Sequence, residues 1–305
     1  MAQPITAVLT GRFFVTGFLP VFLVAGYVWL LISAGAASGR PDFTAAWHHA
    51  SSLTIAQIML ALVGVILVAV LLTPLQAGTM RLLQGQLPKP LVEAGRAWQR
   101  HLRTRQQAAL GRLLAASDDP DHASVQRAGR LSARLLRRYP AEPRELGPTA
   151  LGNTLAAMED SAGSQYGYDA VVAWPRLYPV LDPATRAIVD DRRTALDACA
   201  RLCTAFAVAA LVSLGLLADD GPWLTLVLVP SGLAWLSYAS AIRSAEAYAL
   251  AVEVAFDLNR FALYEALHLP LPENAAAERE LNRRLCLQWR QGVPADFTYR
   301  PPGSP

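Results

Sequence analysis

Two uncharged apolar runs, each joined to a charged stretch, constrain this chain more than any other feature. Residues 202–218 and 223–242 contain no Asp, Glu, Lys, Arg or His. An α-helix rises 1.5 Å per residue, so each run approaches the ~30 Å of hydrocarbon in a bilayer. Charged segments lie before the first run and after the second. We therefore expect two transmembrane helices that continue as helical stalks on one side of the membrane.

The ends of these two helices are marked by residues that start and stop helices. Asp182-Pro183 favours a start, because the carboxylate caps free amides and a proline at the first helical position loses no hydrogen bond. Asp219-Asp220-Gly221-Pro222 is typical of a turn. The sequence predicts one helix over 182–218 and a second from 223 to about 267.

The composition requires further segments in lipid. Hydrophobic residues make up 53% of the chain and charged residues 17%, which is below the quarter usual in soluble domains. Residues 13–35 and 53–76 are the additional apolar runs, and the sequence predicts an all-α integral membrane protein with four transmembrane helices. Cleavage as a signal peptide is an alternative for the first run, because Ala34-Gly35-Ala36 resembles a cleavage site. Its apolar core of about 20 residues exceeds the usual 7–15 and favours a retained helix.

The arginine distribution sets the predicted orientation. The basic residues near the membrane on the side of residues 77–201 are Arg81, Lys89, Arg192, Arg193 and Arg201, and they outnumber Arg40 in 36–52. The positive-inside rule places that side in the cytosol of a bacterial plasma membrane, with both termini cytosolic. The predicted order is a cytosolic leader (1–12), a first span (13–35), an extracellular loop (36–52), a second span (53–76), a cytosolic helical domain (77–181), a stalk with the third span (182–218), an extracellular turn (219–222), a fourth span (223–242) and a cytosolic stalk helix and tail (243–305).

The cytosolic domain contains a basic amphipathic helix. Helices are expected over 91–116 and 123–138, and arginines recur at helical spacing on the second, away from its apolar side. Such a helix can present a solvated face, bind anionic lipid or bind a cytosolic protein. Nucleic acid is not expected, because no aromatic residues alternate with the arginines to stack on bases. The five arginines are Arg127, Arg130, Arg134, Arg137 and Arg138.

Three acidic residues follow one line of the last stalk helix. Glu246, Glu253 and Asp257 are spaced i, i+7 and i+11, which places them on one face. They fit either an ion-pair belt that sets the packing of the stalks or a charged vestibule ring in an oligomer. The arginines expected at the same level are Arg81, Arg176, Arg192 and Arg193.

A rigid, partly buried corner is predicted just before the first stalk. Residues 151–159 and 166–179 combine glycine, proline and aromatic residues with charges. The pattern Leu-Gly-Asn at 151–153, then Glu159, then Tyr-Gly-x-Asp-Ala-Val from 166 and Trp-Pro-Arg-Leu from 174, resembles uncharacterised multi-pass membrane proteins of actinobacteria. That resemblance implies a taxon and no mechanism. The corner residues are Asn153, Glu159, Tyr166, Asp169, Trp174 and Pro175.

The sequence lacks the motifs of several known enzyme classes. No nucleophile elbow, zinc-protease helix, phosphate-binding glycine loop or paired CxxC occurs. Cys199 and Cys203 lie four apart with no matching pair, so two buried residues at a helix contact are preferred to half a metal site. The uncharged spans disfavour proton-coupled transport. We therefore predict no catalytic residue, no cofactor and no metal.

These observations favour a non-enzymatic membrane anchor, scaffold or sensor. Its expected partners are membrane lipids, further copies of the chain and a cytosolic protein. The alternative is an oligomeric ion channel, because the order of spans, insert and tail resembles the layout of bestrophin-type anion channels. Residues 53–72 would then line a hydrophobic gate. A membrane-embedded enzyme using Glu159, Asp169 or the charges at 190–193 is the third possibility.

Overall fold

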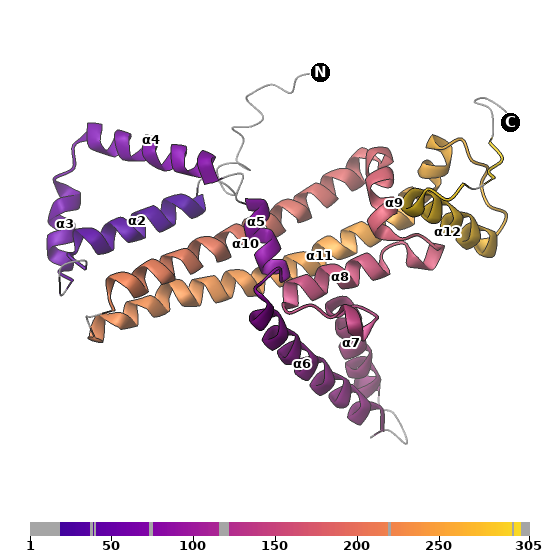
Figure 1. The fold of residues 1–305 in the computed structure, drawn as a ribbon, viewed down its shortest axis with the longest axis horizontal. Helices are drawn as coiled ribbons and strands as arrows, with labels where there is room; N and C mark the ends of the chain where they lie inside the picture. The colour runs from indigo at the N-terminus through magenta and orange to yellow at the C-terminus, as the bar shows by residue number, and fades with distance from the viewer. Residues whose placement is uncertain are drawn as a thin grey trace. The chain divides into compact units, whose positions relative to one another are not determined.

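A computed structural model describes residues 19–36, 39, 41–72, 76–115, 122–218, 221–294 and 296–299. These residues form helices and turns without a strand, which confirms the all-α prediction (Figure 1). The chain divides into two compact units. Unit 1 comprises residues 1–82 and 194–241, and unit 2 comprises residues 83–193 and 242–305. The long helices α10 (Pro183–Leu216) and α11 (Leu228–Ala266) contribute to both units.

Two helices are long and apolar enough to cross a membrane. They are Pro183–Leu216, with 34 residues, and Gly221–Ala266, with 46 residues. A third span is present if α3 (Phe43–Ser51) and α4 (Ile55–Leu72), which are bent by 106° at their junction, are counted together. The apolar part of α2 (Leu19–Ser33) is shorter than these. The predicted leader 1–12 and parts of the other predicted elements, at 13–18, 73–75 and 219–220, lie outside the described residues.

The structure differs from the sequence prediction between the first two apolar runs. Residues 36–52 were expected to form a loop, whereas Phe43–Ser51 is helix α3. The side chain of Asp42 accepts hydrogen bonds from the backbone amides of Thr44 at 2.9 Å and Ala45 at 3.4 Å. This N-cap starts a helix in a segment whose histidines and serines show no clear apolar period.

Unit 1 is held together by contacts of α2 with the apolar end of α10 and with residues 223–227, which precede α11. Leu31, Ala36 and Leu217 are buried against one another. The hydroxyl of Tyr27 donates to the carbonyl of Leu226 at 3.3 Å and accepts from the hydroxyl of Ser213 at 3.3 Å. Both polar groups are therefore satisfied inside an apolar cluster.

Each of the two long helices has a proline in its first turn. The Asp182 carboxylate accepts hydrogen bonds from the amides of Ala184 at 3.0 Å and Thr185 at 2.9 Å, which confirms the predicted start of α10. The second long helix is preceded by the 3₁₀ segment η7 (Gly221–Val227). Pro230 lies in the first turn of α11, where its missing N–H has no helical acceptor to lose.

Unit 2 packs a set of shorter helices around the charged ends of α10 and α11. α6 (Lys89–Ala115) contacts α7 (His122–Arg138), and α7 contacts α8 (Ala150–Ser161). α8 contacts α9 (Ala170–Leu177), and α12 (Ala275–Gln291) contacts α9 and the 3₁₀ turn η5 (Ser164–Tyr166). Two further 3₁₀ turns are η4 (Pro143–Glu145) and η6 (Tyr178–Val180). α5 (Gln76–Gln84) begins in unit 1 and ends in unit 2.

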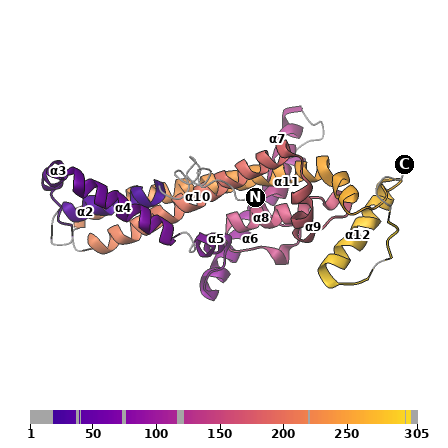
Figure 2. The ribbon, with the colours of Figure 1, turned by 90° about the horizontal axis from the view of Figure 1, so that it is seen from above.

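Within unit 2, α10 and α11 lie side by side in both views (Figures 1 and 2). The amide of Asp182 donates to the side chain of Asn259 at 2.9 Å, and the Arg193 guanidinium lies 5.6 Å from the centre of the Tyr248 ring. Gly167 shows how closely α12 is packed on this core. Its φ of 83° suits glycine, and a Cβ there would lie 2.5 Å from the carbonyl oxygen of Arg279.

Candidate functional site

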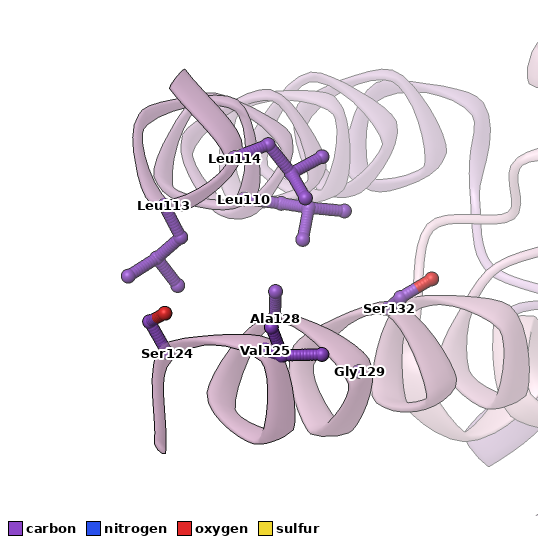
Figure 3. A pocket seen from close by; sticks show the side chains of 8 residues that line it. All are labelled: Leu110, Leu113, Leu114, Ser124, Val125, Ala128, Gly129 and Ser132. Atoms are coloured by element: carbon purple, nitrogen blue, oxygen red, sulfur yellow. The ribbon is translucent and has the colours of Figure 1, made fainter. Parts of the chain in front are cut away.

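The site is built on α7, whose two sides differ in chemistry. One side lies against α6, where Ala128 is buried. A cavity of about 420 Å³ opens between these helices, and Figure 3 shows the leucines of α6 above the small side chains of α7. The residues that line it are Leu110, Leu113, Leu114, Ser124, Val125, Ala128, Gly129 and Ser132.

The other side of α7 carries its arginines toward α11. Arg130, Arg134 and Arg137 are exposed, and Arg138 is half-buried. These four positions share one side of the helix because they are spaced i, i+4, i+7 and i+8. Together with α11 they border a second cavity of about 430 Å³. We call it the arginine groove, and its lining residues are Arg130, Ala133, Arg134, Arg137, Arg138, Arg243 and Glu246.

One ion pair joins the two helices across the arginine groove. Nε of Arg138 donates to Oε1 of Glu246 at 2.7 Å, and both side chains are about a quarter exposed, at 24% and 26%. Glu246 is the one acidic residue among the described lining residues, whereas five are arginines. The lining therefore has an excess of four positive charges at neutral pH.

The remaining acidic residues of the α11 line contact neutral groups. The hydroxyl of Ser161 donates to Glu253 at 2.6 Å. Asp257 accepts hydrogen bonds from the side-chain amide of Gln165 and from the hydroxyl of Tyr166, both at 2.9 Å. The three carboxylates of α11 thus contact α7, α8 and η5 in turn. These contacts position the shorter helices of unit 2 against α11.

Of the four arginines predicted at this level, three belong to unit 2. Arg176 lies over the ring of Trp289 at 4.6 Å, and Arg193 lies over Tyr248. Arg192 is exposed on α10, and Arg81 lies on α5 in unit 1. The acidic line forms an ion pair through Glu246, with Arg138 of α7.

Most of the predicted corner residues tie helices together. Asn153 is fully buried on α8, where its side chain accepts from the amide of Gly147 at 2.6 Å and donates to the carbonyl of Gly147 at 3.2 Å. Asp169 caps α9 by accepting from the amide of Val171 at 3.0 Å, and it forms an ion pair with Arg290 of α12. The corner therefore ties α8 to the loop that precedes it and α9 to α12.

The aromatic part of the corner packs on α11. The Trp174 ring lies 6.0 Å from that of Phe256. Pro175 is inside α9, two residues before its end. Glu159 is exposed on α8, and desolvation together with the charge of Asp160 raises its pKa.

A buried polar network between α11 and α12 was not predicted. Arg260 forms an ion pair with Glu278 at 2.9 Å, with side chains that are 18% and 10% exposed. The hydroxyl of Tyr264 donates to Asn282 at 2.7 Å, and Asn282 donates to the carbonyl of Tyr166 at 2.8 Å. The sequence of α12 contains a pattern that could have predicted this contact, because its buried residues recur at helical spacing. They are Glu278, Asn282, Leu285 and Cys286.

The cysteines are free thiols. Cys199 is half-buried, and Cys203 and Cys286 are buried. Burial raises the pKa of Cys286 to about 11. Across the described ranges, no group of three or more His, Cys, Asp or Glu side chains is arranged to hold a metal ion.

Comparisons of the sequence with protein-family models and curated proteins, and of the fold with solved structures, found no match. The function is therefore argued from the residues of the chain itself. The arginine groove is the strongest candidate site, because it is the place where charge is concentrated and not balanced by the fold.

Proposed function

We propose that this protein is a non-enzymatic membrane anchor that holds a scaffold or sensor domain at the cytosolic surface for a protein partner. In this proposal the chain crosses the membrane four times, unit 2 contains the cytosolic insert, and copies of the chain associate. The positive-inside distribution of arginine supports the orientation. The candidate spans of the structure support attachment to the membrane.

The continuity of α11 is the observation that carries the proposal. This single helix has 39 residues. Its first part is uncharged up to Ile242, and its later part supplies Phe256, Leu263 and Tyr264 to the buried core of unit 2. A helix that continues from a candidate span into the core of a folded unit would attach that unit to the membrane.

Unit 2 also offers exposed apolar surface that a partner protein would cover. Leu114 at the end of α6 is 61% exposed, Val125 on α7 is 54% exposed, and both line the α6–α7 cavity. Leu136 on α7 is 72% exposed. Large apolar side chains gathered on one helix pair favour a protein contact.

Isolation of the protein with its partner tests this proposal. The chain should be solubilised in detergent from its host and recovered with a stoichiometric cytosolic protein. Leu114→Asp should release the partner while the helical circular dichroism spectrum stays unchanged. Ile188→Asp is the matched control, because Ile188 is also exposed, at 55%, but lies on α10 and does not line the α6–α7 cavity. A preparation without a partner under all growth conditions would contradict the proposal.

An oligomeric ion channel is the second candidate, and the surface of α4 favours it. Ile55 is 82% exposed and Leu60 is 73% exposed, and this uncharged helix would form a hydrophobic gate if several copies surrounded an axis. Particle symmetry in detergent separates the two functions. A ring that conducts ions in planar bilayers supports the channel, whereas a monomer or dimer that is silent in bilayers supports the anchor.

A further inference from the structure

The arginine groove holds more positive charge than the ion pairs of the fold use. Arg138 is paired with Glu246 at 2.7 Å. No ion pair to a described carboxylate is present for the other four arginines of the groove, and all four are exposed. Arginines spaced three or four residues apart on one helix repel one another. The four are Arg130, Arg134, Arg137 and Arg243.

The helix dipole explains only part of this arrangement. Arg137 and Arg138 lie in the last turn of α7, where the carbonyl end of a helix stabilises positive charge. Arg130 and Arg134 precede that turn, and Arg243 belongs to a different helix. Their convergence on one cavity therefore lacks a local structural cause and indicates an anionic ligand.

The shape and donor set of the groove identify the class of anion. Guanidinium groups present N–H donors in a planar fork that matches two oxygens of a phosphate group. A volume of about 430 Å³ lies within the range of small-molecule sites, which is roughly 300–1,000 Å³. The Glu246 carboxylate, which would repel an anion, is bound to Arg138.

The position of Arg243 in the sequence identifies the source of the phosphate. It comes directly after Ile242, the last residue of the uncharged run in α11. One residue of helix advances about 1.5 Å, so Arg243 lies at the boundary between the apolar part of this candidate span and unit 2. A lipid phosphate occupies the same boundary in a bilayer, between the hydrocarbon and the water.

We propose that the arginine groove binds the phosphate headgroup of an anionic phospholipid, with arginines from both α7 and α11 as donors. The Arg138–Glu246 pair holds α7 against α11 and so keeps the two sets of donors together. This inference rests on the membrane attachment proposed above, and it adds a specific lipid class to it. A headgroup in the groove would couple the position of α7 to the composition of the inner leaflet.

Binding of short-chain lipids tests the proposal on the full chain in uncharged detergent. Dihexanoyl phosphatidic acid should raise the melting temperature saturably at fixed ionic strength, and dihexanoyl phosphatidylcholine should not. Arg134→Ala and Arg243→Ala should each weaken the binding of phosphatidic acid roughly tenfold, because each removes a charge-assisted hydrogen bond. Arg134→Lys should recover part of the affinity, since lysine keeps the charge and loses the fork.

Arg127→Ala is the matched control variant. Arg127 lies on the same helix and is exposed, but it does not line the groove. Its removal should leave the affinity for phosphatidic acid unchanged. Each variant should first show the wild-type melting temperature without lipid, which separates loss of the ligand from loss of the fold.

Three results would overturn the proposal. Equal affinity in the wild type, Arg134→Ala and Arg243→Ala would place the lipid elsewhere. Saturable binding of inorganic pyrophosphate without binding of phosphatidic acid would assign the groove to a soluble phosphate compound. Absence of a response to either ligand would remove the anion site, and recovery of a cytosolic partner in the same preparation would show that the anchor proposal stands independently.

Discussion

Two of the polar contacts that α11 makes in unit 2 differ in how their charges are matched. Against α12, Arg260 meets Glu278, and the groups of Tyr264 and Asn282 are paired with each other. Against α7, Glu246 is the one acidic residue among five arginines lining the arginine groove. The first contact is buried and balanced, and the second is partly exposed and strongly positive.

This difference separates a structural contact from a candidate binding surface. A buried ion pair is costly to desolvate and is tolerated when every group has a partner. An exposed pair contributes little to stability, so additional arginines beside it gain little for the fold. The balanced contact should therefore respond strongly to substitution in stability, whereas the arginine groove should respond mainly in ligand binding.

Removal of Glu278 should break the balanced contact most severely. Glu278→Ala leaves the guanidinium of Arg260 buried without its carboxylate, and we expect a loss of about 3 kcal/mol of unfolding free energy. Thermal and denaturant unfolding in detergent measure this loss. Glu280→Ala is the control, because Glu280 is exposed on the same helix. A loss equal to that of the control would show that α12 does not depend on this ion pair.

Removal of Asn282 should cost about 2 kcal/mol of unfolding free energy. Asn282→Ala leaves the hydroxyl of Tyr264 and the carbonyl of Tyr166 without their partner inside the protein. Tyr264→Phe in the wild-type chain should cost about 1 kcal/mol, and it should cost less in the Asn282→Ala chain, where the hydroxyl has already lost its acceptor. An equal cost in both chains would mean that the hydrogen bond between Tyr264 and Asn282 does not contribute to stability.

The sequence predicts the long helices better than the contacts between them. Asp182-Pro183 locates the start of α10, because capping depends only on neighbouring residues. Helix α3 was missed because its strongest signal is a single capping residue, Asp42, in a polar segment. A capping residue therefore predicts a helix start when a long helical segment follows it, and a cap alone in a polar segment does not.

The arginine groove could be predicted only in part. The spacing of the α7 arginines placed them on one side of a helix, and the spacing of the α11 acids placed those on one line. Their meeting could not be predicted, because Arg138 and Glu246 are 108 residues apart in sequence and come together through the packing of α7 against α8. The same packing brings Arg243 of α11 beside the arginines of α7.

Thiol chemistry probes the docking of α12 without changing a charge. Burial raises the pKa of Cys286 to about 11, and its sulfur accepts a hydrogen bond from the amide of Asp169 at 3.3 Å. In a chain with Cys199→Ser and Cys203→Ser, iodoacetamide at pH 8 should react about 20-fold more slowly with Cys286 than with an ordinary thiol. This factor combines the smaller thiolate fraction with the higher nucleophilicity of a basic thiolate.

The labelling rate should rise steadily up to about pH 11, the pKa of Cys286 in the folded protein. Leu287→Cys in a chain without the other cysteines is the matched control, because Leu287 is 48% exposed on the same helix. Mass spectrometry of the labelled peptide gives both rates. Equal rates at the two positions would indicate that α12 leaves the core easily, which would weaken the contrast between the two contacts.

The smallest stability effect should come from the ion pair of the arginine groove. Glu246→Ala removes the same type of side chain as Glu278→Ala, but its pair with Arg138 is about a quarter exposed, at 26% and 24%. We expect a loss of about 1 kcal/mol of unfolding free energy or less, because solvent screens the pair and replaces its hydrogen bonds. Thermal and denaturant unfolding in detergent give the loss for Glu246→Ala, which is compared with the loss for Glu278→Ala. A cost as large as that of Glu278→Ala would mean that α7 depends on this pair for its fold, and the excess of arginine would then need a structural explanation.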